Sequence, residues 1–128
     1  MDKVLLVALG GAAGSVLRYA LSGLAQAAAP RSVFPYGTLA VNVAGSFLAG
    51  LLWGLFENRL ISPQARVFLF AGLLGGFTTF SAFALESMHL LRDGELASAC
   101  ANMAATNMAG LAAAFAGYLL ARSITRPA

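Results

Sequence analysis

The sequence predicts an all-α integral membrane protein. Hydrophobic residues make up 59% of the 128 residues and charged residues only 10%, whereas a soluble domain carries roughly 25% charged residues. The mean hydropathy is correspondingly high, at +0.79. Four apolar stretches are each long enough for the about 20 residues that a membrane-spanning helix needs, and short connectors between them carry most of the charges. We expect one four-helix transmembrane domain over residues 1–128, with helices at about 4–28, 34–56, 67–91 and 96–121.

The composition argues against several classes of function. The chain has a single cysteine, Cys100, and a single histidine, His89. An internal disulfide is therefore impossible, and no ligand cluster or HExxH motif is present for a metalloenzyme. The net charge of +3 bears on membrane orientation, because the sequence contains no basic run and no RNA-binding motif. We expect no enzyme activity and no nucleic-acid partner.

The first apolar segment begins like a secretory signal peptide, with Lys3 before an apolar run and an A-x-A site at 25–27. Because Arg18 interrupts that run and similar segments follow, we expect it to be retained as a spanning helix. Gly10, Gly14 and Arg18 recur at four-residue spacing, and the small part of this stripe suits close helix packing. Arg18 itself has two interpretations: a snorkelling arginine near the helix end, or a charge that draws anions to a pore mouth.

The 34–56 segment repeats the four-residue spacing with a polar start and a small remainder. Gly50 and Gly54 at its end indicate close packing against another helix. Asn42 lies deeper than the helix end, where an unpaired amide in hydrocarbon is costly. Its side chain therefore either hydrogen-bonds to another helix or faces a polar path as a donor.

The stretch 75–83, which reads GGFTTFSAF, stands in the middle of the third apolar segment. Its two adjacent glycines weaken a helix, and the hydroxyls of Thr78, Thr79 and Ser81 can hydrogen-bond backbone groups that a helix break leaves free. Such a break in a spanning helix is tolerated only where protein or a water-filled cavity covers the freed backbone. We expect the 67–91 helix to be broken at mid-membrane, and this break to be the functional centre.

After the expected break, Phe80, Phe83 and Ser87 fall on one face of the helix. Two phenylalanines at this spacing are ordinarily core residues, so spacing alone favours packing over a functional role. Glu86 follows about one turn beyond Phe83. It lies either at the membrane interface or, if deeper, is a functional candidate that needs a partner.

The 96–121 segment contains two asparagines, Asn102 and Asn107, which is more than helix packing usually requires. Four short helices cannot surround a large cavity, so we expect a homo-oligomer whose polar positions meet near the subunit interface. Neutral donors of this kind suit a small anion or water better than a metal cation, which would call for carboxylates. Phenyl rings are electropositive at their edges and can also face an anion. The side chains that we expect along this path are Asn42, Thr79, Ser81, Asn107, Phe80 and Phe83.

Basic residues are more numerous on the side of the membrane that holds both termini. That side holds Lys3, Arg59, Arg66, Arg122 and Arg126, and the other holds Arg31, Arg92 and Arg18. The positive-inside rule then favours termini in the cytoplasm, although the small difference leaves insertion in both orientations open.

Three stretches together resemble the Fluc (CrcB-type) family of fluoride channels. GGFTTFSAF, followed by Glu86, resembles the family's third-helix signature GGxTTFSTF. The 35–50 stretch is similar to its pattern PxGTLxxNxxGxxxxG, and Gly14 to Tyr19 is similar to its GxxxR-aromatic stretch. The match covers essentially the whole chain, with the motifs in the family's order.

This resemblance implies an antiparallel, dual-topology homodimer in the cell inner membrane, with two fluoride pores and a structural sodium ion at the dimer centre. It places the pore asparagine at Asn42, the two pore phenylalanines at Phe80 and Phe83, the polar track at Thr79, Ser81 and Asn107, the vestibule arginine at Arg18, the accessory glutamate at Glu86, and the sodium-binding backbone carbonyls at Gly75 and Thr78. The chain departs from the family pattern at Phe77, Ala82 and Met103. Met103 stands where some members have a tyrosine in the polar track, so we do not place it in the path.

The resulting hypothesis is a passive, fluoride-selective channel that exports fluoride from the cytoplasm and relieves its toxicity. A negative interior drives an anion outward by about 2.3 kcal/mol per charge per 100 mV, and no Walker motif for a pump is present. One alternative is a small proton-coupled multidrug exporter, although such exporters rely on a glutamate in the first helix, where this chain has Arg18 and no acid. Another is a non-transporting membrane subunit, which would not require a broken helix.

Overall fold

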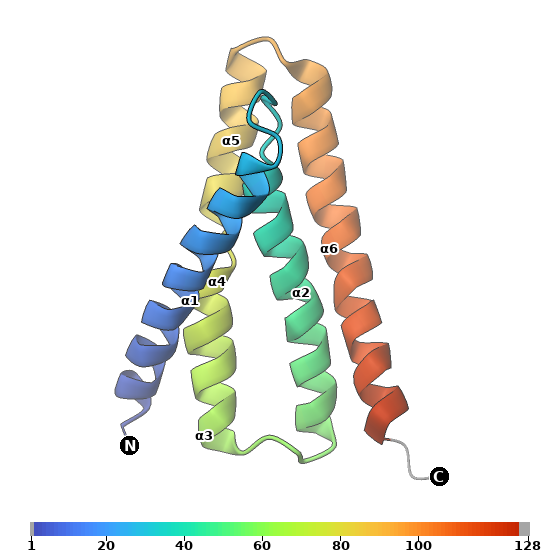
Figure 1. The fold of residues 1–128 in the computed structure, drawn as a ribbon. Helices are drawn as coiled ribbons and strands as arrows, with labels where there is room; N and C mark the ends of the chain where they lie inside the picture. The colour runs from blue at the N-terminus through green and yellow to red at the C-terminus, as the bar shows by residue number, and fades with distance from the viewer. Residues whose placement is uncertain (1, 126–128) are drawn as a thin grey trace.

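The computed structural model describes residues 2–125, and their regular secondary structure is entirely helical (Figure 1). A π-helical stretch, Val67–Leu74 (η1), follows the short helix Pro63–Arg66 (α3) without interruption, and Gly75–Phe77 (α4) follows directly after it. In chain order the elements are α1 (Lys3–Ala27), α2 (Tyr36–Glu57), α3 (Pro63–Arg66), η1 (Val67–Leu74), α4 (Gly75–Phe77), α5 (Phe80–Arg92) and α6 (Leu96–Thr125).

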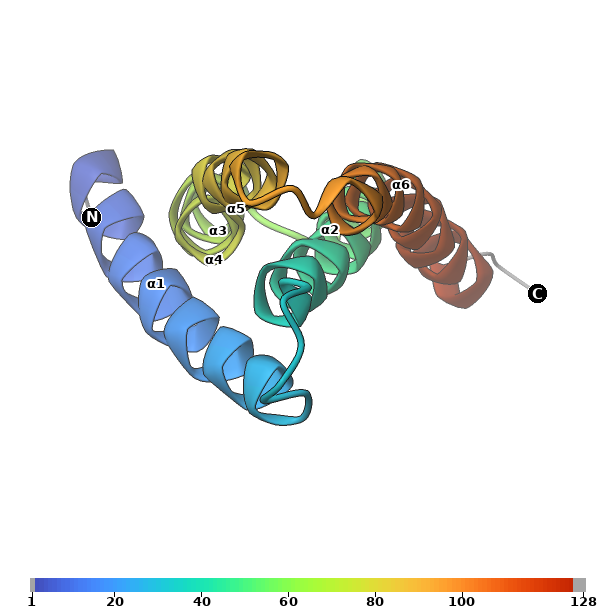
Figure 2. The same ribbon diagram turned by 90° about the horizontal axis from the view of Figure 1, so that it is seen from above.

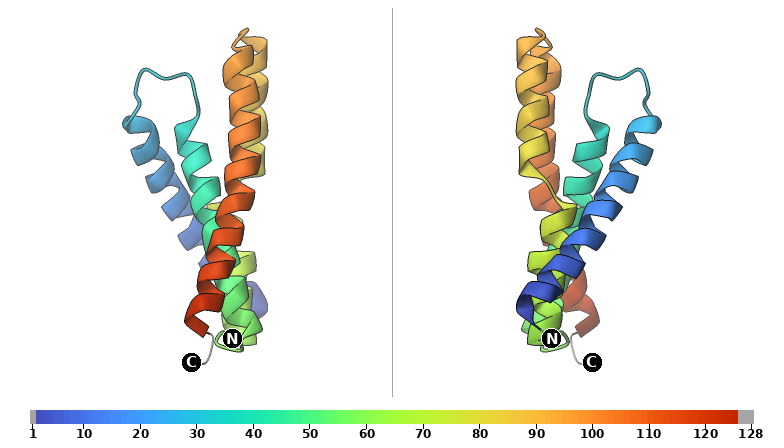
Figure 3. Two further views of the ribbon diagram at one scale, coloured as in Figure 1. Left: turned by 90° about the vertical axis from the view of Figure 1, so that its right-hand side faces the viewer. Right: turned by 90° about the vertical axis from the view of Figure 1, so that its left-hand side faces the viewer.

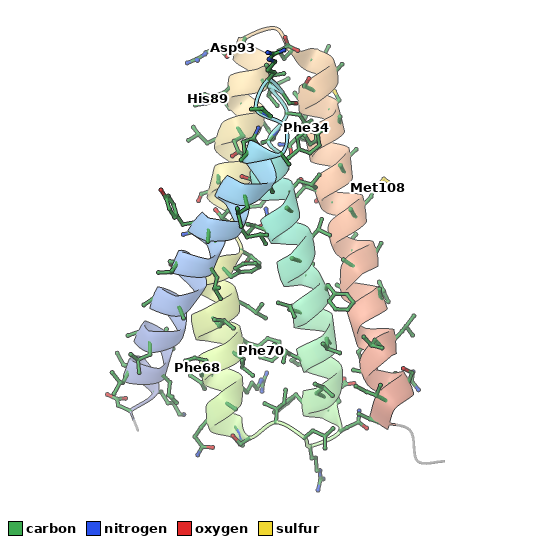
Figure 4. The ribbon with its side chains drawn as sticks, in the orientation of Figure 1. Phe34, Phe68, Phe70, His89, Asp93 and Met108 are labelled. Carbon is green, nitrogen blue, oxygen red and sulfur yellow. The ribbon has the colours of Figure 1, made fainter. Side chains whose placement is uncertain are left out.

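Four parts of the chain are long and apolar enough to cross a membrane: α1, α2, the run Pro63–Arg92 and α6. The structure therefore agrees with an all-helical, multi-pass membrane protein. The third span begins at Pro63 rather than at 67, because the Ser62 hydroxyl caps the Ala65 N–H at 3.2 Å and proline is favoured in the first helical turn. Large apolar side chains cover the outside; Met108, which is 72% exposed, projects away from α6 (Figure 4).

The helices form two pairs of neighbours that separate toward one end of the molecule. The start of α1, the 58–62 connection and the end of α6 share one end, and the 28–35 and 93–95 connections lie at the other (Figure 1). Toward this second end, the α1–α2 pair and the α5–α6 pair stand apart (Figure 3). Viewed from above, α1 lies to one side and α6 to the other, with the α3–α5 run and α2 between them (Figure 2). Of the basic residues counted for orientation, Arg126 lies outside the described residues.

Glycines allow the spans to approach one another at backbone distance. In α1, a Cβ on Gly10 would lie 2.6 Å from the Phe68 carbonyl oxygen of η1, and one on Gly14 would collide with the Leu73 carbonyl. The contact between α2 and α6 is of the same kind, since a Cβ on Gly50 would collide with the Ala114 carbonyl. The small-residue stripes therefore pack within one chain, which is how such stripes stabilise helix pairs in membranes.

Polar and aromatic side chains close the end of the molecule at which the 58–62 connection lies. The Glu57 carboxylate accepts hydrogen bonds from the Trp53 indole at 2.9 Å and from the Tyr118 hydroxyl of α6 at 3.0 Å. The Arg66 guanidinium lies over the Phe56 ring, 4.5 Å from its centroid. Amphipathic rings with charged partners are typical of the membrane–water boundary, so this end is suited to the headgroup region.

We predict that Gly14→Ala lowers the thermal stability of the purified protein, because the added methyl must push the Leu73 carbonyl away from α1. Overpacking of this kind costs about 1–3 kcal/mol. Gly23→Ala in the same helix is the matched control, since a Cβ there meets nothing within 4 Å and alanine is the better helix former by about 1 kcal/mol. Melting curves in detergent compare the two variants; equal melting temperatures would show that α1 does not depend on this close approach.

Candidate functional site

Two residues of extended backbone separate α4 from α5. Thr78 has φ −82° and ψ 157°, and Thr79 has φ −150° and ψ 115°. The side chain of Asn42 on α2 holds this segment with two hydrogen bonds: its Oδ1 accepts from the Thr79 N–H at 2.8 Å, and its Nδ2 donates to the Thr79 carbonyl at 2.9 Å. Asn42 thus pairs both backbone groups of one extended residue and keeps one amide N–H in reserve.

The extended segment redirects the N–H groups that would otherwise serve two particular carbonyls. In a continuous helix each N–H bonds the carbonyl four residues earlier, so the Thr79 N–H would bond Gly75 and the Ala82 N–H would bond Thr78. Here the Thr79 N–H bonds Asn42, and the Ala82 N–H bonds the Thr79 hydroxyl at 3.2 Å as an N-cap of α5. The Gly75 and Thr78 carbonyl oxygens therefore lose their usual helical donors.

The glycines at 75 and 76 predicted that the helix would break at that pair, but the extended backbone lies two to three residues later. Gly75 itself is helical, with φ −61° and ψ −38°, and the extended residues are Thr78 and Thr79. The neighbouring Gly76 serves for contact, since a Cβ there would collide with the Gly11 carbonyl of α1. Gly76 is therefore used for close approach to α1, and the two threonines provide the extended backbone.

A groove of about 470 Å³ runs between α2, the α4–α5 region and α6. It brings together most of the side chains predicted for the path, drawn from three spans, and its lining contains no charged residue in the described chain. Ser81 does not line it, although its Oγ lies 3.3 Å from the Thr79 Oγ1, which does. The lining residues that the sequence predicted are Asn42, Thr79, Phe80, Phe83 and Asn107, together with Gly75 and Thr78.

The two phenylalanines of the groove differ in their surroundings. Their ring centroids are 5.5 Å apart with the planes tilted by 53°. Phe83 is only 8% exposed, whereas Phe80 is 77% exposed. On the opposite wall the Asn107 amide donates to the Met103 carbonyl of its own helix at 2.7 Å. One ring is therefore fixed in the protein, while the other is presented outward from the groove.

A second hollow, of about 970 Å³, lies between α1, α2 and α5 and contains the charged candidates. Arg18 and Glu86 both line it, and Thr79 lines both hollows. The Thr38 hydroxyl donates to one Glu86 oxygen at 2.6 Å, while the other, Oε2, is buried without a hydrogen-bond partner in the described structure. Glu86 therefore lies inside the protein with one oxygen unpaired, and it shares a hollow with Arg18.

Three polar residues of the site were not among the predicted path residues. Thr38 is the partner of Glu86, Thr106 lines the groove, and the fully buried Asn102 accepts a hydrogen bond from the Thr106 hydroxyl. Their positions in four-residue rows with other polar side chains were visible in the sequence, but such rows do not reveal which members face inward. Within residues 2–125, no three His, Cys, Asp or Glu side chains gather into a metal site.

Comparison with known proteins gives matches over nearly the whole chain. The family described as "CrcB-like protein, Camphor Resistance (CrcB)" matches residues 5–118. A protein of Parabacteroides distasonis is 49% identical over 124 residues, which cover 97% of this chain and 96% of that protein. Proteins of Rhizobium meliloti, at 47% identity, and Thermus thermophilus, at 48%, match 97% and 94% of this chain and 99% and 95% of their own lengths. All three are named "Fluoride-specific ion channel FluC".

We predict that Asn42→Ala destabilises the protein, since it leaves the Thr79 N–H and carbonyl without their partners. An unpaired buried polar group costs about 1–3 kcal/mol. Asn107→Ala is the control, because its exposed amide bonds only to its own helix. Thermal unfolding in detergent measures both. A melting temperature of Asn42→Ala no lower than that of Asn107→Ala would mean that the Asn42 hydrogen bonds do not hold the extended segment.

Proposed function

The chain belongs to the CrcB-like protein family, and on this basis we propose that it is a fluoride-selective passive channel that lets fluoride leave the cytoplasm. Relatives at 47–49% identity over nearly their full lengths are named as fluoride-specific channels, and a channel is not an enzyme. The observation that carries the proposal is the uncharged groove in which Asn42, Phe80 and Phe83 come together. Relief of fluoride toxicity would be the consequence of this export.

The chemistry of the groove suits a small, strongly hydrated anion. Fluoride can leave water only where other donors replace its hydration shell. The hydroxyl of Thr79 and the amides of Asn42 and Asn107 line the groove as neutral donors. The positive edges of the Phe80 and Phe83 rings would add weaker contacts without trapping the ion. Arg18, in the adjoining hollow, would raise the local concentration of anions at the entrance.

The homodimer is supported by the open form of the groove. Phe80 is 77% exposed although it lines the groove, and an anion path needs walls on all sides. We infer that a second copy, inserted antiparallel, covers this face, so that each of two grooves becomes a pore. The excess of basic residues at one end is small, so the positive-inside rule only weakly favours one orientation, and insertion in both is compatible with it.

The structural sodium ion is supported by the state of two backbone carbonyls. The N–H groups that would pair with Gly75 and Thr78 in a helix bond elsewhere, which leaves both oxygens for a hard cation that prefers oxygen ligands. Both residues line the groove face that the second copy would cover. The carbonyls of both copies would then hold one ion between them, where it would neutralise the oxygens and join the subunits.

The multidrug exporter and the non-transporting subunit find no support in the structure. α1 contains Arg18 but no aspartate or glutamate between Lys3 and Ala27, so the acid on which such an exporter relies is missing from this helix. A subunit that only packs against partners would not need a groove with donors from three spans.

We predict that liposomes containing the protein release fluoride, measured with a fluoride electrode, and that they release little chloride. Phe83→Ile and Phe80→Ile should each reduce fluoride flux at least about tenfold, because an aliphatic side chain lacks the positive ring edge. Phe115→Ile on α6, which is exposed and does not line the groove, is the control. Wild-type liposomes that pass no fluoride, or pass chloride equally well, would refute the channel. Normal flux in both variants would refute the role of the rings.

We also predict that sodium stabilises the detergent-solubilised protein more than potassium or choline does at equal ionic strength. A ligand present at 100 times its Kd stabilises the folded state by about 2.7 kcal/mol, which a melting curve resolves. Choline cannot be coordinated by carbonyl oxygens, and so it reports the effect of salt alone. Identical melting temperatures in all three salts would contradict a sodium site.

A further inference from the structure

A chain of hydrogen bonds connects the two walls of the groove through the interior of the protein. Asn102 of α6 is 0% exposed, and its Nδ2 donates to the Ser87 hydroxyl of α5 at 3.0 Å. The Ser87 hydroxyl donates in turn to the Phe83 carbonyl at 2.8 Å. At the other end, the Thr106 hydroxyl donates to the Asn102 Oδ1 at 3.3 Å. The chain therefore runs Thr106–Asn102–Ser87–Phe83.

Both ends of this chain of bonds lie in the wall of the groove. Phe83 lines it from α5, and Thr106 lines it from α6 next to Asn107. Asn102 and Ser87 do not line it themselves. They are buried between the two helices and cannot touch an ion in the groove, so any effect that they have on conduction must act through the position of the walls.

A buried amide constrains the separation of two helices more tightly than an apolar side chain does. An apolar residue at position 102 would fill the space with little dependence on small shifts of α6 along α5. An amide must keep its donors and acceptors within hydrogen-bond distance, because a buried polar group without a partner is costly. Here the Asn102 amide and the Ser87 hydroxyl are both paired within their own helices, and the bond from Asn102 to Ser87 ties α6 to α5 at one register.

We propose that Asn102 and Ser87 are positioning residues that set the distance between the Phe83 ring and the α6 wall, and thereby the preference of the groove for fluoride over larger anions. This inference rests on the proposed channel function. The width of a path lined by neutral donors decides which anion the donors can surround. A wall that shifts outward admits chloride, while a fluoride ion then meets fewer donors at once.

The test measures the ratio of fluoride to chloride flux in liposomes containing the full-length protein. Ser87→Ala removes only the hydroxyl, Asn102→Leu replaces the amide by an apolar side chain of similar size, and the double variant combines them. Ser98→Ala is the matched control, because this half-buried serine of α6 has a hydroxyl whose one hydrogen bond in the described structure is to the Glu95 carboxylate, at 3.5 Å. Melting temperatures of the same preparations record whether each variant is folded.

We expect the flux ratio to fall about tenfold in Ser87→Ala, the size of one lost buried hydrogen bond. The ratio should fall by a similar factor in Asn102→Leu. In the double variant it should be no lower than in the more affected single variant, because the two residues act through one chain of bonds. Ser98→Ala should keep the wild-type ratio. A purely structural role would lower melting temperature and leave the ratio of the remaining flux unchanged.

The outcomes separate this inference from the function on which it rests. Selective flux in the wild type with an unchanged ratio in folded Ser87→Ala overturns the inference alone. Additive losses in the double variant also overturn it, since they would mean that the residues act independently. A wild-type protein that passes no fluoride overturns the proposed channel and this inference together. If Asn102→Leu does not fold, the ratio in Ser87→Ala decides.

Discussion

The pairing of the Thr79 backbone by the Asn42 amide is the interaction on which the rest of the site depends. A chain that crosses a membrane must satisfy every backbone N–H and carbonyl within the protein, because hydrocarbon offers no partners. Asn42 satisfies both groups of Thr79 from another helix, and the Thr79 hydroxyl satisfies the Ala82 N–H. With these bonds in place, the chain can be extended for two residues inside a 30-residue apolar run.

Several other features follow from this one pairing. Asn42 and the Thr79 hydroxyl accept hydrogen bonds from the N–H groups of Thr79 and Ala82. In a continuous helix these N–H groups would pair with the carbonyls of Gly75 and Thr78, which therefore lose their helical donors. The change of direction also presents Phe80 and Phe83 to the groove at the start of α5. On the side opposite Asn42, α1 packs against the residues just before the extended segment, where Gly11 and Gly76 meet at backbone distance. Thus close packing on one face and an amide on the other hold the same short segment.

The separation of neutral and charged groups is a second organising feature. The groove is lined by amides, hydroxyls and rings, while Arg18 and Glu86 lie in the adjoining hollow and Thr79 lines both. In the proposed channel, a fixed cation inside the groove would bind an anion tightly and slow its release, whereas neutral donors would allow it to enter and leave. The buried hydrogen bonds of Asn102 and Ser87 connect the two helices that wall the groove, and they do so without adding charge.

The sequence by itself determined the spans, the residue types available to the site and the family, because apolar length and motif are local properties that need no knowledge of distant contacts. Only the tertiary structure decided how these residues are used. The glycines at 75 and 76 suggested where the helix breaks, but Gly75 is helical, Gly76 packs against Gly11 of α1, and the extended residues are Thr78 and Thr79. The sequence left open whether Asn42 faces a polar path or bonds to another part of the protein. The structure pairs it with the backbone of Thr79, 37 positions away. Hydrogen-bond partners between helices are set by how the helices pack, and no single segment contains that information.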